Sequence, residues 1–368
     1  MTITEEMLSP YAFACLQQIK HTDKHKSTKL VSTFLPRKNY VLHSACLSLY
    51  LELGLKLVKV HRVLSFQTSV FLAKYVTYCT TKRAESKSEF KKRLFKLFSN
   101  ANFGKFIQQT RSYLSCVIVS NPADFQKYVT KPNFSNFKVL GGNFIACFMK
   151  PKSIYFNQSW GIGFTILERS KWLIFHNYYK IIKPALEGRV SVCFTDTDSL
   201  LLKIKTDLTM DEVMQKLSGI MDFSNYDSKH ELFNADNRNK IKFWKDENKG
   251  NVVVAFCGIC SKTYSMIVCK PDGTDLGHNS KCKGVGRCCK DNIMFEDFKK
   301  CIDYIDIHMV EQYRIQSKDH IIRTVKSNRL AYSSFDDKRF LICSVHSVPY
   351  GSKYIALCER LQRCVFCK

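Results

Sequence analysis

The chain has 368 residues, of which 45% are hydrophobic and 13% aromatic, as is typical of a globular protein with two or three subdomains and a proper core. Lys and Arg number 57 against 32 Asp and Glu, and the first 120 residues hold 19 basic against 6 acidic residues. The formal charge of +25 predicts a polyanionic partner, first of all nucleic acid. No stretch reaches the roughly 18 apolar residues of a membrane span, so no membrane partner is expected.

The 17 cysteines are scattered and odd in number, which predicts reduced thiols and an intracellular location, the nucleus if the host is a eukaryote. Two groups allow zinc as an alternative: Cys257 with Cys260, and Cys358 with Cys364 and Cys367. No second close pair stands beside either group at finger-like spacing, and buried free cysteine is common. We therefore expect these cysteines to be free thiols. Cys257 is expected to lie in a buried strand.

The first third of the chain predicts a short capped helix at residues 4–8 and two further helical regions. Apolar residues between Tyr40 and Val63 recur near helical spacing, and residues 56–63 then alternate as in a strand. The longest predicted helix covers Ala84–Asn100 and should stop at Gly104 in a left-handed conformation. One face carries Lys92, Lys96 and Asn100, and the opposite face carries Phe90, Leu94, Leu97 and Phe98. The basic face suits a triphosphate, with an ordinary solvent-facing helix as the alternative.

Residues 116–270 mix short strands with a few helices, including one over 170–179, and predict an α+β core. Within it, Asp196 and Asp198 stand in a turn between the apolar runs 190–194 and 200–202. Two acids at a hairpin tip repel unless a cation lies between them, and hard oxygen ligands without His or Cys suit Mg²⁺. A plain polar β-turn is the alternative interpretation.

The last hundred residues begin with a Gly-containing basic passage, 277–286, that includes Lys281 and Lys283. Such a loop suits contacts with a duplex backbone, although a solvated linker is an equally simple interpretation. The segment Glu296–Gln316 is predicted to be mainly helical.

Three motifs in this order resemble those of family B DNA polymerases, in particular the protein-primed type of viruses and Maverick/Polinton-like mobile elements. Residues 96–104, KLFSNANFG, are similar to the fingers motif K-x-x-x-N-S-x-Y-G. Residues 194–199, FTDTDS, are similar to the palm motif Y-x-D-T-D-S, and residues 262–264, KTY, are similar to the K-x-Y motif. Any one motif is weak, but their order and separations together are specific.

The resemblance implies nucleotidyl transfer from a deoxynucleoside triphosphate to the 3′ end of a primer, supported by two Mg²⁺ ions, with Mn²⁺ as a substitute. Asp198 would be the metal ligand and Asp196 its supporting carboxylate. The implied nucleotide-binding residues are Lys92, Lys96, Asn100 and Phe103, and the implied DNA contacts are Gly104, Lys262, Tyr264, Lys281 and Lys283. The implied partners are primer–template DNA, the nucleotide and a terminal protein primer.

The expected architecture is an α+β palm with an antiparallel sheet, helical fingers and a small thumb, forming an incomplete right hand without an exonuclease domain. We assign residues 1–75 to a remnant leading into the palm, 76–115 to the fingers, 116–270 to the palm and 271–368 to the thumb and tail.

One element of the family pattern is missing. The family's other metal-binding Asp lies in a D-x-x-S-L-Y-P-like segment upstream of the fingers, yet the only Asp before Asp124 is Asp23, in a polar context. We therefore expect a truncated polymerase that extends primers poorly. The alternatives are a catalytically inactive DNA-binding relic and a zinc-stabilised nucleic-acid module.

Overall fold

The computed structural model describes residues 1–19, 25–155, 157–238, 240–286, 289, 291–318 and 321–367. The chain forms two compact units, one of residues 1–40 with 179–368 and the other of residues 41–178. Asp23, the one early aspartate, lies outside the described residues. Among the described residues, no helix combines the length and the hydropathy that crossing a bilayer requires.

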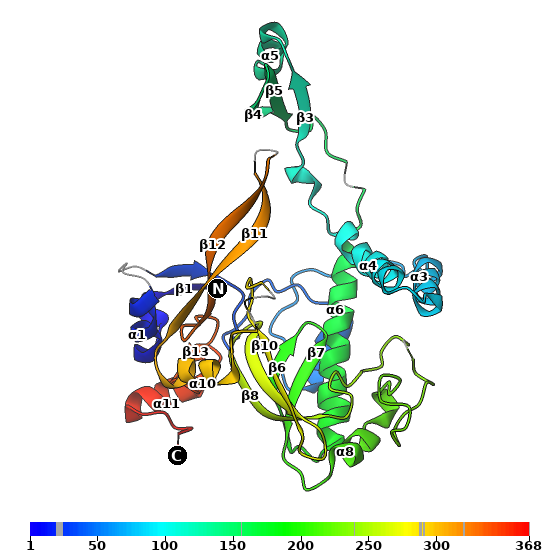
Figure 1. The fold of residues 1–368 in the computed structure, drawn as a ribbon, viewed down its shortest axis with the longest axis vertical. Helices are drawn as coiled ribbons and strands as arrows, with labels where there is room; N and C mark the ends of the chain where they lie inside the picture. The colour runs from blue at the N-terminus through cyan, green and yellow to red at the C-terminus, as the bar shows by residue number, and fades with distance from the viewer. Residues whose placement is uncertain are drawn as a thin grey trace. The chain divides into compact units, whose positions relative to one another are not determined.

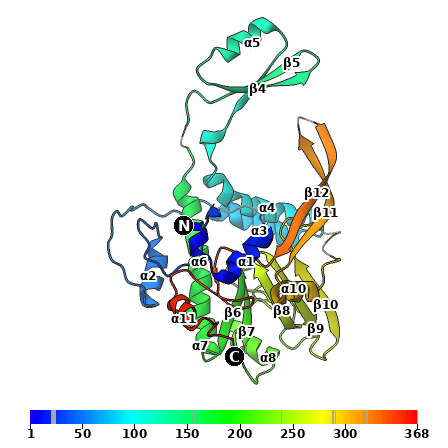
Figure 2. The same cartoon turned by 90° about the vertical axis from the view of Figure 1, so that its left-hand side faces the viewer.

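The fold is mixed α+β, as predicted, and its strands are combined into several small antiparallel sheets (Figures 1 and 2). The helices are α1 (Pro10–Ile19), α2 (Ser44–Glu52), α3 (Ala73–Glu85), α4 (Glu89–Phe106), α5 (Pro122–Val129), α6 (Trp160–His176), α7 (Lys183–Ala185), α8 (Met210–Lys216), α10 (Phe295–Asp303) and α11 (Lys353–Leu361). The paired strands are β1 (Thr2–Thr4) with β2 (Lys26–Thr28), β3 (Ser115–Val119) and β4 (Phe134–Gly141) with β5 (Phe144–Met149), β6 (Val190–Asp196) with β7 (Ser199–Ile204), β8 (Val252–Cys260) and β10 (Asp275–Lys281) with β9 (Thr263–Cys269), β11 (Ile307–Lys318) with β12 (Ile321–Ser333), and β13 (Phe340–Leu341) with β14 (Ser347–Val348).

The unit of residues 41–178 contains a helical part and a small sheet. Helix α6 begins close to the end of α4: a Cβ on Gly163 would lie 2.2 Å from the side chain of Ile107, so only glycine allows this approach. The sheet β3-β5-β4 packs with α5 over a small core that includes Val119, Cys147 and Met149. Asn121 caps the N-terminus of α5, because its side chain accepts a hydrogen bond from the backbone N–H of Asp124.

A hydrophobic core of the other unit lies between the sheet β8-β9-β10, helix α10 and the β11–β12 hairpin. It contains Cys282, Ile293, Phe298, Cys301 and Tyr332 among its buried members. The side chain of Gln312 joins the hairpin base to the loop after β10, because its Oε1 accepts from Gly286 and its Nε2 donates to Gly284. The outer part of β11–β12 extends away from this core as a two-stranded ribbon (Figure 1).

A buried charge cluster connects a segment near the N-terminus with residue 337, near the C-terminus. Asp337 is 1% exposed, and its carboxylate accepts hydrogen bonds from the His25 ring (3.0 Å), the Ser27 hydroxyl (2.6 Å) and the Lys29 ammonium. Burial alone would raise the pKa of Asp337, but the hydrogen bonds from Lys29, Ser27 and His25 outweigh it and lower the pKa below its usual value. The cluster thus fixes β2 against the segment that leads into β13.

The predicted helices are confirmed in part, and the structure corrects several predicted elements. The helix expected over Ala84–Asn100 is divided, because Ala84 and Glu85 end α3 and α4 begins only at Glu89. The α4 helix continues through Gly104 to Phe106, so the left-handed stop at Gly104 was wrong. Residues 56–63 form no strand and are exposed, because no neighbouring strand covers their alternating pattern. The segment 296–316 is helical only to Asp303 and then becomes β11, because long-range pairing with β12 overrides the local helical preference.

Replacing Asp337 with Asn should lower the free energy of unfolding by about 2 kcal/mol, because it removes the buried carboxylate charge that accepts hydrogen bonds from Lys29, Ser27 and His25. The stabilisation by the wild-type carboxylate should be fully present above about pH 4, the pKa of an unfolded aspartate, and should be lost as the pH falls through the lower folded value. Urea unfolding at pH 7 and pH 3 measures both effects. Asp336→Asn is the control, because burial raises the pKa of its carboxyl and neutralisation there should cost little. Equal losses in the two variants would contradict this role of Asp337.

Candidate active site

The acidic pair lies at the tip of a hairpin, as the sequence predicted. Strands β6 and β7 are antiparallel, Asp196 pairs with Ser199, and Thr197 and Asp198 form the two-residue connection. The register shifts between Val192 and Phe194, so the strand bulges just before the motif. Apolar runs on both strands form the hairpin, while the polar turn stands at its exposed end.

The turn between the two acids has a strained backbone. Thr197 has a φ of 58°, in the left-handed region that β-branched residues rarely adopt. The Asp198 N–H donates to the Asp196 carbonyl at 2.6 Å, which closes a tight γ-like turn. The Thr197 hydroxyl donates to Asp196 Oδ1 at 3.1 Å, and the Ser199 hydroxyl donates to the Asp196 carbonyl at 3.2 Å. Strain of this kind persists where the surroundings enforce it, often at functional sites.

The K-x-Y segment contacts this acidic turn. Lys262 lies in the turn between β8 and β9, and its Nζ is 3.3 Å from Asp196 Oδ1. It also has a positive φ, 65°, so both turns that meet here hold a non-glycine residue in the left-handed region. Tyr264 is the second residue of β9, and its ring packs on the ring of Phe194 with centroids 4.7 Å apart. The structure therefore brings two of the three sequence motifs together.

An aromatic layer supports the contact between the two hairpins. Phe256 of β8 lies 6.4 Å from Phe194 and 5.8 Å from Tyr264, between ring centroids. Burial, followed by the negative charges of Asp196 and Glu247, raises the pKa of Tyr264 above its usual value. The phenol therefore stays protonated at neutral pH and keeps a hydrogen-bond donor beside the acids.

The Lys262–Asp196 ion pair is a surface interaction, because the two side chains are 54% and 35% exposed. Pairs of this kind contribute about 0–1 kcal/mol, so separating Lys262 from Asp196 would cost little free energy. The basic character continues across the sheet: Lys281 lies opposite Tyr264 in the β9–β10 ladder, and Lys283 follows in the next turn, exposed.

The predicted nucleotide-binding residues lie on α4, in the other unit. Lys96 and Asn100 are exposed and Phe103 is half-buried, whereas Lys92 is paired with Glu89 at 2.8 Å. A shallow pocket of about 360 Å³ lies along the end of the helix, lined by Tyr75, Phe98, Ala101, Asn102, Gly104, Lys105 and Gln108. Asn102 Nδ2 and Gln108 Oε1 are buried and have no hydrogen-bond partner among the described residues.

The pocket therefore involves Gly104 but a different face of α4 from the predicted Lys92, Lys96 and Asn100. The sequence interpretation missed Asn102 and Gln108, although Asn102 lies within the fingers motif. It also missed Phe256, whose place in an apolar strand does not reveal which ring it meets. The left-handed conformation of Thr197 could have been predicted from the sequence, because a two-residue connection between two strands often requires a positive φ.

Cys257 and Cys260 form no metal-binding group among the described residues. Cys257 is buried in β8, and burial raises the pKa of its thiol to about 11. It is therefore a neutral core side chain, as expected.

Comparisons with family models, curated proteins and solved structures find no match to this chain. The resemblance to family B polymerases thus stays a prediction that rests on the three motifs.

Replacing Thr197 with Gly should raise the free energy of unfolding by about 1 kcal/mol, because relief of the left-handed strain exceeds the entropic cost of glycine. Thr195→Gly is the matched control: it removes a side chain from the extended part of β6 and should lower stability by about 1 kcal/mol. Thermal unfolding of both variants measures the difference. A loss of stability in both would show that Thr197 is not strained.

Proposed function

We propose that this chain is the palm, fingers and thumb portion of a family B DNA polymerase of the protein-primed, mobile-element-like type. The observation that carries the proposal is the contact between the two motifs: Lys262 reaches Asp196, and Tyr264 packs on Phe194. These residues are far apart in the sequence, and the resemblance of their two motifs to the family pattern does not depend on either contact. A plain polar turn would not require a lysine and a tyrosine from a second hairpin.

The donor set at the tip fits a magnesium site in part. Asp196 and Asp198 offer hard oxygen atoms on one turn, the ligand type that Mg²⁺ prefers. In nucleotidyl transfer such ions stabilise the attacking and leaving oxygens. The protein residues would act around them: Tyr264 and Lys262 would hold the backbone of the primer terminus, and Lys262 would move from Asp196 to a phosphate. Lys96 would neutralise the triphosphate.

A second candidate function is supported by a specific observation. Among the described residues, no third His, Cys, Asp or Glu forms a metal-binding group with Asp196 and Asp198. A two-metal site normally draws carboxylates from more than one strand, so this pair alone holds two ions weakly. This shortage favours a catalytically inactive protein that retains the DNA-binding surface.

The β11–β12 ribbon supports DNA as the partner in both candidates. Arg314, Arg323, Lys326 and Arg329 are exposed on it, and Glu311 is the one acid among its described residues, paired with Lys326 at 2.8 Å. A two-stranded basic ribbon can follow a duplex backbone, and the aromatic ring of Tyr313, 67% exposed, lies among these cations. Binding should therefore weaken steeply as salt is added.

Single-nucleotide incorporation on a primer–template in Mg²⁺ and in Mn²⁺ separates the two candidates. The polymerase proposal expects slow, template-directed incorporation, greater in Mn²⁺, which Asp198→Asn abolishes while DNA affinity stays within about twofold, because removing a metal ligand at the tip spares the phosphate contacts. Asp207→Asn, a few residues beyond β7, is the matched control and should retain incorporation.

DNA binding without any incorporation in either metal would favour the inactive relic. Absence of both DNA binding and incorporation would contradict both candidates.

Replacing Lys96 with Ala should raise the nucleotide concentration needed for half-maximal binding by about tenfold or more, because a charge-assisted contact to phosphate is lost. DNA affinity should change little. Lys91→Ala on the same helix is the matched control. Titration with a fluorescent deoxynucleotide in Mn²⁺ measures the nucleotide affinity of both variants. An equal effect of the two substitutions would indicate that α4 contributes only general positive charge.

A further inference from the structure

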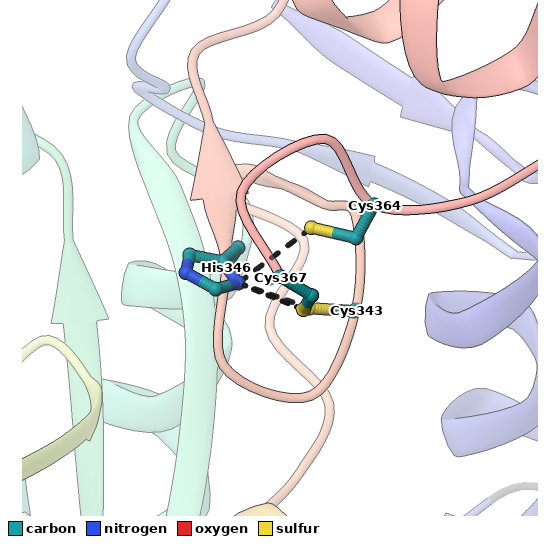
Figure 3. Close-up of side chains that lie close together, drawn as sticks. All are labelled: Cys343, His346, Cys364 and Cys367. Atoms are coloured by element: carbon teal, nitrogen blue, oxygen red, sulfur yellow. Dashed lines mark hydrogen bonds between the residues drawn. The ribbon is translucent and has the colours of Figure 1, made fainter. Parts of the chain in front are cut away.

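The C-terminal region brings four metal-ligating side chains to one point. Cys343 and His346 lie in the connection between β13 and β14, and Cys364 and Cys367 follow α11 (Figure 3). One ligand atom from each lies within 4.8 Å of every other. We propose that these residues form a structural zinc site of the Cys₃His type, with a CxxH pair and a CxxC pair.

The interatomic distances match those around a zinc ion. His346 Nδ1 lies 3.3 Å from the sulfur of Cys343, 3.6 Å from that of Cys364 and 3.4 Å from that of Cys367. The sulfurs of Cys343 and Cys367 are 3.7 Å apart. A tetrahedral zinc ion with bonds of about 2.3 Å to sulfur and 2.0 Å to nitrogen separates two sulfurs by about 3.8 Å and a sulfur from the nitrogen by about 3.5 Å.

Hydrogen bonds alone do not account for this arrangement. A neutral imidazole nitrogen accepts through one lone pair, yet three sulfurs surround the same Nδ1 at similar distances (Figure 3). A disulfide would join two of the three cysteines and leave the third sulfur and the imidazole unexplained. A cation at the centre satisfies all four atoms at once.

The chemistry and spacing favour zinc among the metals. Three thiolates and one imidazole in a closed set are typical of structural zinc sites, in which each ligand pair is separated by two residues. The set contains no carboxylate, so it does not suit Mg²⁺. The ring of Phe366 lies beside His346, with centroids 5.6 Å apart, and Tyr354 packs on Phe366 at 5.0 Å. These ring contacts hold the His346 loop near the end of α11.

The surrounding structure needs such a cross-link. The buried part of the local core consists of Ile3, Phe340, Val348 and Tyr350, and β13 and β14 have two residues each. So small a core supplies little stability, and a metal is a common substitute. Zinc would join the β13–β14 hairpin to the segment after α11, where Gln362 reverses the chain with a φ of 49°.

The sequence interpretation considered Cys364 and Cys367 together with Cys358 and missed the other pair. Cys358 is buried in α11 and does not belong to the group. The sequence does contain a signal, because Cys343-Ser344-Val345-His346 has the two-residue spacing of a ligand pair, although this pair is Cys–His and not Cys–Cys.

Metal analysis of the full chain, purified under reducing conditions without chelator, tests the proposal. We expect about one zinc ion per chain, and replacement by Co²⁺ should give the visible absorption of a tetrahedral cobalt–thiolate centre. Cys364→Ser and His346→Gln should each lower the zinc content to near zero. His346→Cys should restore it, because four thiolates also form a structural zinc site. Cys358→Ala is the matched control and should keep its zinc.

A second readout separates metal binding from general misfolding. Chelation of zinc from the wild-type chain should make residues 340–367 sensitive to limited proteolysis while the β6–β10 region stays resistant. Full zinc content in both Cys364→Ser and His346→Gln would overturn the proposal. So would a wild-type chain that binds neither zinc nor cobalt, or a disulfide between Cys343 and Cys367 under reducing conditions.

Discussion

The contact between the β6–β7 turn and the β8–β9 turn is the interaction on which the functional interpretation depends. It has an electrostatic part, Lys262 with Asp196, and a packing part, in which Phe194, Phe256 and Tyr264 bring the two hairpins together. The ion pair is exposed and weak, so the aromatic layer supplies most of the stability. A rigid apolar base below a weakly paired, exposed acid suits a site where a ligand exchanges with the lysine. It also explains why two strained turns can persist at this place.

The sequence predicted the parts of the fold that depend on local pattern. The β6–β7 hairpin followed from two apolar runs around a polar turn, and α4 followed from its helical period. The predictions that failed depended on distant partners: β11 pairs with β12 over its whole length, against a local preference for helix. Residues 56–63 alternate like a strand, but nothing in the sequence indicates that no neighbouring strand covers them.

Those residues of the candidate site that lie in short motifs of fixed spacing could be predicted from the sequence. Asp196, Asp198, Lys262 and Tyr264 were found because each lies in a short recognisable string. Phe256 was not found, because any apolar strand residue has the same appearance in the sequence. The Cys₃His group was predictable only in part: each of its pairs has a two-residue spacing in the sequence, but a strand and a helix separate the pairs, and only tertiary structure brings them together. The charge cluster at Asp337 is a third example, with partners from the opposite end of the chain.

The β11–β12 ribbon has a consequence for the behaviour of the protein in solution. Both of its strands are edges, with unpaired backbone donors and acceptors, and Ile315, Ile322 and Leu330 are exposed on it. Such a ribbon is a template for pairing with a second copy, and positively charged side chains are the usual protection against this association. Arg314, Arg323, Lys326 and Arg329 are exposed on the same ribbon, so the mutual repulsion of these charges opposes such pairing. Neutralising them would remove this repulsion and favour aggregation through the exposed edges.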